Sequence, residues 1–417
     1  MSKNIREISV KILSDVFSKG KNLKVEFENK ALHLDTRDSA FLKFSVFGVI
    51  RLKKSIDDIL SELYSGNYNK VNEVSKNILR LGVFQIHFMN SVPNYAAVNS
   101  MVEIAKKQNL KFSKVVNAIL NRYIRERKKI LINSMHNHSG EIIDQLKSDY
   151  SIEDIRRICS WNDQLPITWL RIKESEKNKL SEIFKAEIQK FGQGLNYINV
   201  SRLDQQIKAY LEEGILRVQS PGSGLVVNLL NVKNGEKIID ACAAPGGKSE
   251  YILELLDCAN LVYINDNNKQ RYQKLKSDFK NYEAKFLCKD ASLQEFPLAD
   301  KILVDAPCSS LGTIQKNPDI KWKKIDLDKL AESQFKILQN MSKNLKSGGT
   351  IVYSTCSISN KENFRVVQRF LELNRNFKID NASKYIDKKF VDKEGCLNIF
   401  PPKHKIEGVF AARLIKG

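Results

Sequence analysis

Apolar residues recur at helical spacing throughout the first 130 residues of the chain. Residues three and four positions apart lie on one face of a helix, so each such stripe predicts a helix with one buried side. The clearest stripes are Ile5, Ile8, Ile12 and Val16; Ile56, Ile59, Leu60 and Leu63; Val98, Met101, Val102 and Ala105; and Val116, Ile119, Leu120 and Tyr123. The pattern predicts an all-helical domain over residues 1–131, with the stripes as its core and no catalytic side chain.

A polar, unperiodic segment, INSMHNHSGE, follows this domain. We expect a linker there, with His136 and His138 in solvent rather than on a metal, and no metal site elsewhere in the chain. The stretches LPITWLRI and NYINVSRL then predict strands, with charged helical patterns between them. These elements predict a small α+β subdomain over residues 142–221. Its lysines could follow an RNA backbone or merely solvate a surface, and the sequence leaves both interpretations open.

From residue 222 to 417, short apolar segments alternate with amphipathic ones. The segments EKIID, LVYIN, AKFLC, KILVDA and GTIVYST have the length and composition of buried strands. Strands that alternate with helices form a parallel sheet covered on both faces, so we expect an α/β, Rossmann-like domain. Ligands of such folds bind beyond the carboxyl ends of the strands. Asp240, Asp266, Asp290 and Asp305 all stand at predicted strand ends.

The loop in DACAAPGGKSEYI resembles a phosphate-binding loop at first sight. Such a loop needs a glycine five residues before the glycine of Gly-Lys-Ser, and Cys242 occupies that position. The strand, the small-residue loop and the helix start instead fit a nucleotide site in which Asp266, about 20 residues further on, meets ribose hydroxyls. No GxGxxG fingerprint is present, which disfavours NAD. The alternative is a tight turn without a ligand.

Charge and composition narrow the class of protein. The chain has 417 residues, 42% hydrophobic and 28% charged, which is typical of globular proteins. Its 68 basic and 48 acidic residues give a net charge of +20, which favours a polyanionic partner. The seven cysteines form no CxxC pair, and neither a signal peptide nor a membrane-spanning run is evident. We expect a cytoplasmic protein without disulfides.

Two cysteines follow predicted strands, Cys308 in DAPCSSLG and Cys356 in YSTCSIS. Such residues are often small buried hydrophobes. Two of them at one edge with four carboxylates instead suggest thiolate chemistry. Carbon 5 of cytosine is too weak a nucleophile to attack a methyl donor until a thiolate adds to carbon 6. An acid near ring nitrogen 3 would stabilise the developing charge, which would account for Asp305 beside the two cysteines.

Longer motifs carry a resemblance to a known family. DACAAPGGKSEYILEL, DNNKQR, KILVDAPCSSLGTIQKNPDIKW and GGTIVYSTCSISNKEN are similar, in order and spacing, to the motifs of RNA cytosine-5 methyltransferases that use S-adenosylmethionine. RLGVFQIHFMNSVPNYAAVNSMVEIAKK resembles the NusB-like helical domain of the bacterial RsmB/Sun type, which modifies 16S ribosomal RNA. The resemblance covers nearly the whole chain, and the motifs around the two cysteines are its most specific part.

The resemblance assigns roles by position. It implies Cys356 as the nucleophile, Cys308 as a second cysteine that assists product release, and Asp305 as the acid that contacts the methionine moiety and the base. Asp266 would bind the ribose and Asp290 the adenine side. The implied donor loop consists of Cys242, Ala243, Ala244, Pro245, Gly246, Gly247 and Lys248. Ser220, where the family often has Asp, and EGVF at Glu407–Phe410, where DGFF is usual, are departures that put local substrate contacts in doubt.

Several alternatives stay open. The chain could be an inactive RNA-binding scaffold, although such a scaffold has no need of two thiols, or it could act on another RNA. DNA cytosine methyltransferases carry their nucleophile in a Pro-Cys, which Pro307-Cys308 would also offer. An amino-group methyltransferase would need an Asn-Pro-Pro-Tyr-like tetrad that DAPC lacks. We expect a monomer whose partner is 16S ribosomal RNA outside the mature subunit, and no membrane partner.

Overall fold

The computed structural model describes residues 5–126, 130, 132–184, 188–201, 203–259 and 261–417. The chain divides into two compact units. The N-terminal unit contains the residues up to Leu165 together with Ile314–Lys324, and the C-terminal unit contains Pro166–Thr313 and Ile325–Gly417. The three-domain division expected from the sequence stays a prediction.

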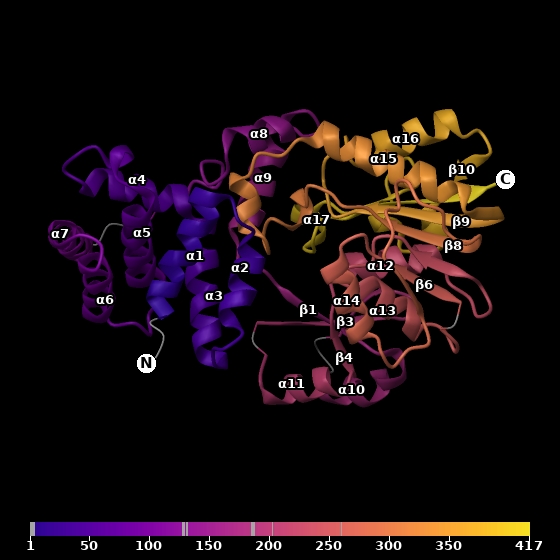
Figure 1. Ribbon diagram of the computed structural model, residues 1–417, viewed down its shortest axis with the longest axis horizontal. Coiled ribbons are helices and arrows are strands. Elements are labelled where there is room, and N and C mark those ends of the chain that lie inside the picture. Colours follow the sequence, from indigo (N-terminus) through magenta and orange to yellow (C-terminus); the bar gives the residue numbers. More distant parts are fainter. Residues whose placement is uncertain (1–4, 127–129, 131, 185–187, 202, 260) are drawn as a thin grey trace. The chain divides into compact units, whose positions relative to one another are not determined.

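The N-terminal unit is helical, as predicted (Figure 1). Its helices are α1 (Ile5–Lys19), α2 (Leu23–Ala31), α3 (Thr36–Arg51), α4 (Lys53–Leu63), α5 (Glu73–Phe88), α6 (Asn94–Lys106), α7 (Leu110–Glu126), α8 (Gly140–Lys147) and α9 (Ile152–Asp163), with 3₁₀ turns η1 (Tyr68–Lys70) and η4 (Pro318–Trp322). The stripes point inward, and Ile12, Ile56, Leu60 and Val116 are fully buried. Asp35 starts α3 by accepting a hydrogen bond from the Asp38 N–H at 2.7 Å, as N-cap residues do.

The predicted linker is partly packed, and the expectation that His138 is solvated was wrong. The His138 ring is buried, with Nδ1 2.7 Å from the Ser134 carbonyl and Nε2 3.1 Å from Asn162 Nδ2. Asn137 is also buried and donates to Ser55 Oγ at 3.0 Å. Burial and the nearby Lys321 lower the pKa of His138, so the ring is neutral. His136 is exposed, as expected. A polar segment can pack when its side chains satisfy one another.

The C-terminal unit begins with a four-stranded antiparallel sheet in the order β2-β3-β1-β4. Its strands are β1 (Thr168–Ile172), β2 (Gln189–Gly192), β3 (Leu195–Val200) and β4 (Leu216–Val218), accompanied by η2 (Glu174–Glu176), α10 (Lys177–Ile183) and α11 (Gln205–Glu212). Leu170, Ile172 and Ile198 form a small core with Leu180 of α10 and Ile207 of α11. The strands predicted in LPITWLRI and NYINVSRL are β1 and β3 of this sheet, whereas residues 142–165 of the predicted subdomain belong to the N-terminal unit.

The remainder of this unit is built on an eight-stranded sheet in the order β10-β12-β9-β8-β5-β6-β7, with β11 beside β12. The five predicted strands are present and parallel: β5 (Ile238–Asp240), β6 (Val262–Asn265), β7 (Lys285–Leu287), β8 (Ala299–Asp305) and β9 (Leu345–Thr355). Three further strands are antiparallel and were not predicted: β10 (Phe377–Ile379), β11 (Leu397–Asn398) and β12 (Phe410–Lys416). The sheet is therefore mixed.

Helices cover both faces of this sheet (Figure 1). They are α12 (Pro221–Leu230), α13 (Gly247–Glu254), α14 (Lys269–Asp278), α15 (Leu327–Lys343), α16 (Phe364–Leu373) and α17 (Pro401–His404), with η3 (Leu311–Thr313), η5 (Ala382–Lys384) and η6 (Lys388–Phe390). Because side chains alternate along a strand, Ile238 joins the core of α12–α14 while Ile239 joins the core of α15 and α16. Within the described ranges, no helix has the length and apolar character to cross a membrane.

Residues 314–324 lie between β8 and α15 in the chain, yet they belong to the N-terminal unit. The Trp322 indole donates to the Ile50 carbonyl at 2.9 Å, and Arg51 donates to the Gln315 carbonyl at 2.9 Å. Lys321 is fully buried, forms an ion pair with Asp163 and donates to the Arg51 carbonyl at 3.1 Å. The motif NPDIKW, which belongs to the connection from β8 to α15, is therefore packed among residues of the N-terminal unit.

Candidate active site

The acidic residues predicted from the strand pattern meet at one edge of the large sheet. Asp240 and Asp305 end β5 and β8, Asp266 directly follows β6, and Asp290 lies just beyond β7. These strands are parallel neighbours, so their carboxyl ends share an edge, where ligands of doubly wound folds bind. Asn265 joins the loops there: its amide donates to the Ala241 carbonyl at 2.8 Å and to the Lys289 carbonyl at 3.0 Å.

The loop from Cys242 to Lys248 connects β5 to α13 at this edge. Gly246 has φ +107°, which favours glycine, and an added Cβ there would lie 2.9 Å from Leu275 and Phe279. At Gly247 an added Cβ would lie 3.9 Å from Gln219 Nε2, an ordinary van der Waals distance, so space remains beside the first turn of α13. That space at a helix start suits a charged, adenosine-bearing cofactor.

Three of the acids frame this loop. Asp240 is buried and accepts a hydrogen bond from Ser249 Oγ at 2.6 Å, and burial raises its pKa to about 7. Asp266 is buried and accepts from the Asn268 N–H at 2.9 Å. Asp290 accepts from the Ser292 N–H at 2.8 Å and from its hydroxyl at 2.6 Å. These short-range hydrogen bonds fix the orientation of each carboxylate at the edge of the sheet.

The two cysteines predicted to act together do lie together. Cys308 Sγ is 3.2 Å from Cys356 Sγ, and Cys356 Sγ is 3.3 Å from Ser310 Oγ. Both cysteines are free thiols. Their mutual hydrogen bond raises the pKa of Cys308 and lowers the pKa of Cys356. Of the two thiols, Cys356 is therefore the one that ionises first.

An ion pair adjoins the thiols. Lys248 Nζ donates to Asp305 Oδ2 at 2.6 Å, and Ser354 Oγ donates to Asp305 Oδ1 at 2.8 Å. Burial opposes the charge of Lys248, but Asp305 outweighs it and raises the pKa of this amine, with a further contribution from Cys356. Lys248 was expected only as part of the cofactor loop, whereas the structure directs its ammonium to the predicted acid.

Other polar residues of the site carried no clear signal in the sequence. Ser310 and Ser354 stand among several serines, and only the fold shows which of them contact a thiol or a carboxylate. Ser310 also has φ +60°, a conformation that non-glycine residues rarely adopt and that often marks functional sites. Asn265 could have been suspected from its position at the end of LVYIN, where a strand meets the ligand edge.

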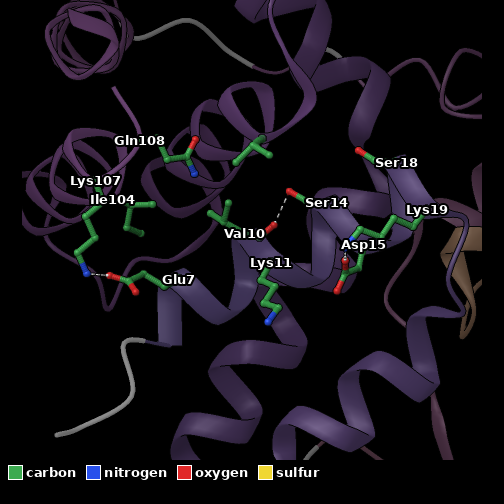
Figure 2. A pocket seen from close by; sticks show the side chains of 11 residues that line it. Glu7, Val10, Lys11, Ser14, Asp15, Ser18, Lys19, Ile104, Lys107 and Gln108 are labelled. Carbon is green, nitrogen blue, oxygen red and sulfur yellow. Dashed lines mark hydrogen bonds and ion pairs between the residues drawn. The ribbon is translucent and has the colours of Figure 1, made fainter. Parts of the chain in front are cut away.

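A separate hollow of about 410 Å³ lies in the N-terminal unit beside α1 and α6 (Figure 2). None of the predicted site residues lines it. Lys107 pairs there with Glu7, and Lys19 pairs with Asp15 at 2.7 Å. Its charges are thus largely compensated by neighbours, and the hollow is distinct from the site around the cysteines.

Comparison with known proteins covers both units. The family described as 16S rRNA methyltransferase RsmB/F matches residues 227–415, and the NusB family matches residues 3–125. The ribosomal RNA small subunit methyltransferase B of Shewanella oneidensis is 31% identical over 99% of both chains. A probable ribosomal RNA small subunit methyltransferase B of Synechocystis sp. is 29% identical over 99% of both chains.

Solved structures agree with the fold. The structure of PH0851 has a TM-score of 0.75 at 22% identity and covers 100% of both chains. The structure of NSun6 from Pyrococcus horikoshii with SFG has a TM-score of 0.54 at 20% identity and covers 67% of this chain and 98% of that one. The sequence similarity to the methyltransferase B proteins extends along the whole chain, over both the NusB-like helices and the Rossmann-like sheet. The chain is an S-adenosylmethionine-dependent methyltransferase that belongs to the ribosomal RNA small subunit methyltransferase B family.

Proposed function

We propose that this enzyme methylates carbon 5 of a cytosine in 16S ribosomal RNA through a covalent bond between a cysteine sulfur and carbon 6 of the base. The observation that carries the proposal is the pair of sulfurs, 3.2 Å apart, beside the ion pair of Lys248 and Asp305. Together these groups offer a nucleophile, a thiol donor and a charge pair at the edge of the sheet where the cofactor loop lies. The names of the Shewanella and Synechocystis relatives support ribosomal RNA of the small subunit as the substrate.

Cys356 is the proposed nucleophile. Its pKa is lowered by the hydrogen bond with Cys308, and the thiolate is the reactive form of cysteine. Addition forms a bond between Cys356 Sγ and carbon 6, and the electrons of the ring double bond move toward carbon 5 and the nitrogen 3 side of the ring. If Cys308 were the nucleophile, as in the DNA enzymes, it would have to ionise against its raised pKa.

Lys248, held in place by Asp305, would stabilise the negative charge that develops on the nitrogen 3 side of the pyrimidine. Ser354 and Lys248 fix both carboxylate oxygens of Asp305, so the group is oriented before the base arrives. S-adenosylmethionine, when bound, supplies an electrophilic methyl group to carbon 5. The residues that would hold it are the loop from Cys242 to Lys248 with Asp266 and Asp290.

Cys308 would act after the methyl transfer. Water takes the proton from carbon 5, the electrons of that C–H bond re-form the double bond between carbons 5 and 6, and the bond to Cys356 Sγ breaks with its electrons on sulfur. The Cys308 S–H, 3.2 Å away, donates to that departing thiolate. A donor to the leaving sulfur lowers the cost of the charge that it gains, so Cys308 promotes release of the methylated RNA.

RNA recognition is assigned to the helical residues 1–131 and to the small sheet within 142–221. The excess of basic over acidic residues, +20 in the chain, supports contact with a polyanion. We infer a cytoplasmic monomer that acts on 16S ribosomal RNA before the subunit matures.

The proposal is tested by mapping 5-methylcytosine in 16S ribosomal RNA by bisulfite sequencing, from cells with and without this protein. One cytosine should lose protection from deamination when the protein is absent. Purified enzyme should restore that mark on RNA from the deficient cells. Restoration of a methyl group on a base nitrogen instead, or on a transfer RNA alone, would contradict the proposal.

A further inference from the structure

A buried carboxylate lies behind the two cysteines. Glu362, in the segment between β9 and α16, has no exposed surface. Its Oε1 accepts hydrogen bonds from the Ser309 N–H at 2.8 Å and from Gln334 Nε2 at 2.9 Å. Its Oε2 accepts from the Ser357 hydroxyl at 2.5 Å and from the Ser309 hydroxyl. Surrounded by donors, the group acts as an acceptor only, which is the hydrogen-bonding capacity of an ionised carboxylate.

The partners of Glu362 are the residues next to the thiols. Ser309 directly follows Cys308, and Ser357 directly follows Cys356. Gln334 of α15, which donates to Glu362, also donates to the carbonyl of Pro307 at 2.9 Å, so the backbone is held on both sides of Cys308. One carboxylate therefore connects the two loops that carry the sulfurs.

The segment that contains Glu362 is itself fixed to the large sheet. Tyr353 of β9 donates its hydroxyl hydrogen to the Glu362 carbonyl at 2.5 Å. The neighbouring Asn363 accepts from the Thr355 hydroxyl at 2.6 Å and donates to the Ser357 carbonyl at 3.0 Å. Buried polar networks with every group paired hold a single conformation, so the spacing of the cysteines is set by this network.

The charge of Glu362 acts on the Cys308 thiol. The hydrogen bond with Cys356 and burial are the main causes that raise the pKa of Cys308, and Glu362 adds to them. Hydrogen bonds with Cys308 and Ser310 lower the pKa of Cys356, against the opposing effects of burial and Asp305. A negative charge placed in this way favours the arrangement in which Cys308 keeps the proton.

We propose that Glu362 is a positioning residue that holds the two cysteine loops together, so that the Cys308 S–H stays within hydrogen-bonding distance of Cys356 Sγ. The inference rests on the proposed function for its meaning in catalysis. Its geometric part concerns the free enzyme and can be tested without RNA.

The experiment compares Glu362→Gln with the wild type and with a control, Glu372→Gln, which alters an exposed acid on α16. In the enzyme without RNA, alkylation of Cys308 and Cys356 by iodoacetamide is followed against pH by peptide mass spectrometry. Wild type and control should alkylate Cys356 at a lower pH than Cys308. In Glu362→Gln, Cys308 should react at lower pH than in the wild type, so that the two profiles approach each other.

The second measurement is the rate of methyl transfer. Because displacement of reacting groups by about 1 Å can cost roughly 100-fold in rate, Glu362→Gln should lower kcat about 100-fold. The KM for RNA and the donor Kd by calorimetry should stay within about threefold. Ser357→Ala removes the hydrogen bond from the Cys356 loop to Glu362, together with the contacts of that hydroxyl with Ser309 Oγ and the Ser359 N–H. This variant should lower kcat about tenfold, and it replaces the first variant if that variant fails to bind donor.

Each result has one consequence. The role of Glu362 is overturned if Glu362→Gln changes neither the alkylation profiles nor kcat. If that variant does not fold, an unchanged kcat in Ser357→Ala has the same consequence. Both results leave the proposed function intact. If the wild type makes no 5-methylcytosine, the proposed function fails, while the alkylation profiles still decide whether Glu362 orders the two thiols.

Discussion

Replacement of Lys321 by methionine tests how the NPDIKW segment is anchored. Lys321 has no exposed surface, forms an ion pair with Asp163 and donates to the Arg51 carbonyl. Burial lowers its pKa from 10.5 to about 8, although Asp163 acts in the opposite direction. Methionine keeps much of the side-chain length and removes the charge.

The expected magnitude follows from these values. Without Lys321, the buried side chain of Asp163 keeps Asn137 Nδ2 at 3.3 Å but loses its counter-ion. Loss of one member of a buried pair costs about 3–5 kcal/mol in unfolding free energy. The double variant Lys321→Met/Asp163→Asn removes both charges and should recover most of that loss.

The pH dependence has a definite sign. The folded pKa of Lys321 lies below its unfolded value, so between about pH 8 and 10.5 the unfolded chain binds more protons. Stability contributed by this group therefore rises with pH across that window, by about 3 kcal/mol at roughly 1.4 kcal/mol per pKa unit. Below pH 8 the contribution is at its minimum. The rise should be absent in Lys321→Met.

Differential scanning calorimetry of the full chain between pH 7 and 9.5 measures both effects. Hydrogen exchange of peptides from 314–324 assigns them to the N-terminal unit. Lys324→Met, which alters an exposed lysine of the same segment, is the control. The reasoning is refuted if Lys321→Met unfolds at the same temperature as Lys324→Met and retains the wild-type pH slope.

Three further outcomes are expected. Asp266→Ala should weaken donor binding about tenfold, or 1.4 kcal/mol, with the fold retained. ATP should not bind, because Cys242 stands where a P-loop needs glycine. Calorimetry that showed ATP binding as tightly as the donor would contradict the assignment of the loop. Gly246→Ala should lose donor affinity, because a residue with a side chain is strained at φ +107° and its Cβ would lie 2.9 Å from Leu275 and Phe279. Unchanged affinity would show that the loop relaxes freely. RNA affinity should fall by about 10³-fold or more between 50 and 200 mM salt if six or more phosphates are contacted, and a flat filter-binding series would rule out the electrostatic contribution.

Local patterns were sufficient for the elements that place the site. The stripe from Ile5 to Val16 and the apolar segment before Asp305 report burial directly, because helices and strands repeat their side-chain directions at fixed periods. Parallel strands bring their carboxyl ends to one edge, so Asp240 and Asp305 could be expected together before any contact was known. The proximity of Cys308 and Cys356 followed from the same rule.

Long-range contacts were beyond such patterns. Nothing periodic in NPDIKW indicates that Lys321 pairs with Asp163, because the two residues are 158 positions apart in the sequence. His138 seemed to lie in a polar linker, and only its contacts with Ser134 and Asn162 explain its burial. Strand β12 is preceded only by the short helix α17 (Pro401–His404), which gives no pattern of a crossover helix, so its antiparallel place beside β9 could not be deduced. Glu362 resembles any acid near a helix start until its partners are seen.

The most direct test of the account separates the two cysteines. Purified wild type, Cys356→Ala and Cys308→Ala are incubated with substrate RNA and S-adenosylmethionine and resolved on denaturing gels, with methyl transfer measured in parallel. Cys356→Ala should transfer no methyl group and form no covalent complex. Cys308→Ala should attack and transfer but release slowly, because the leaving sulfur loses its donor at 3.2 Å, so a protein–RNA adduct should accumulate. An adduct trapped by Cys356→Ala, or full activity in both variants, would contradict the account.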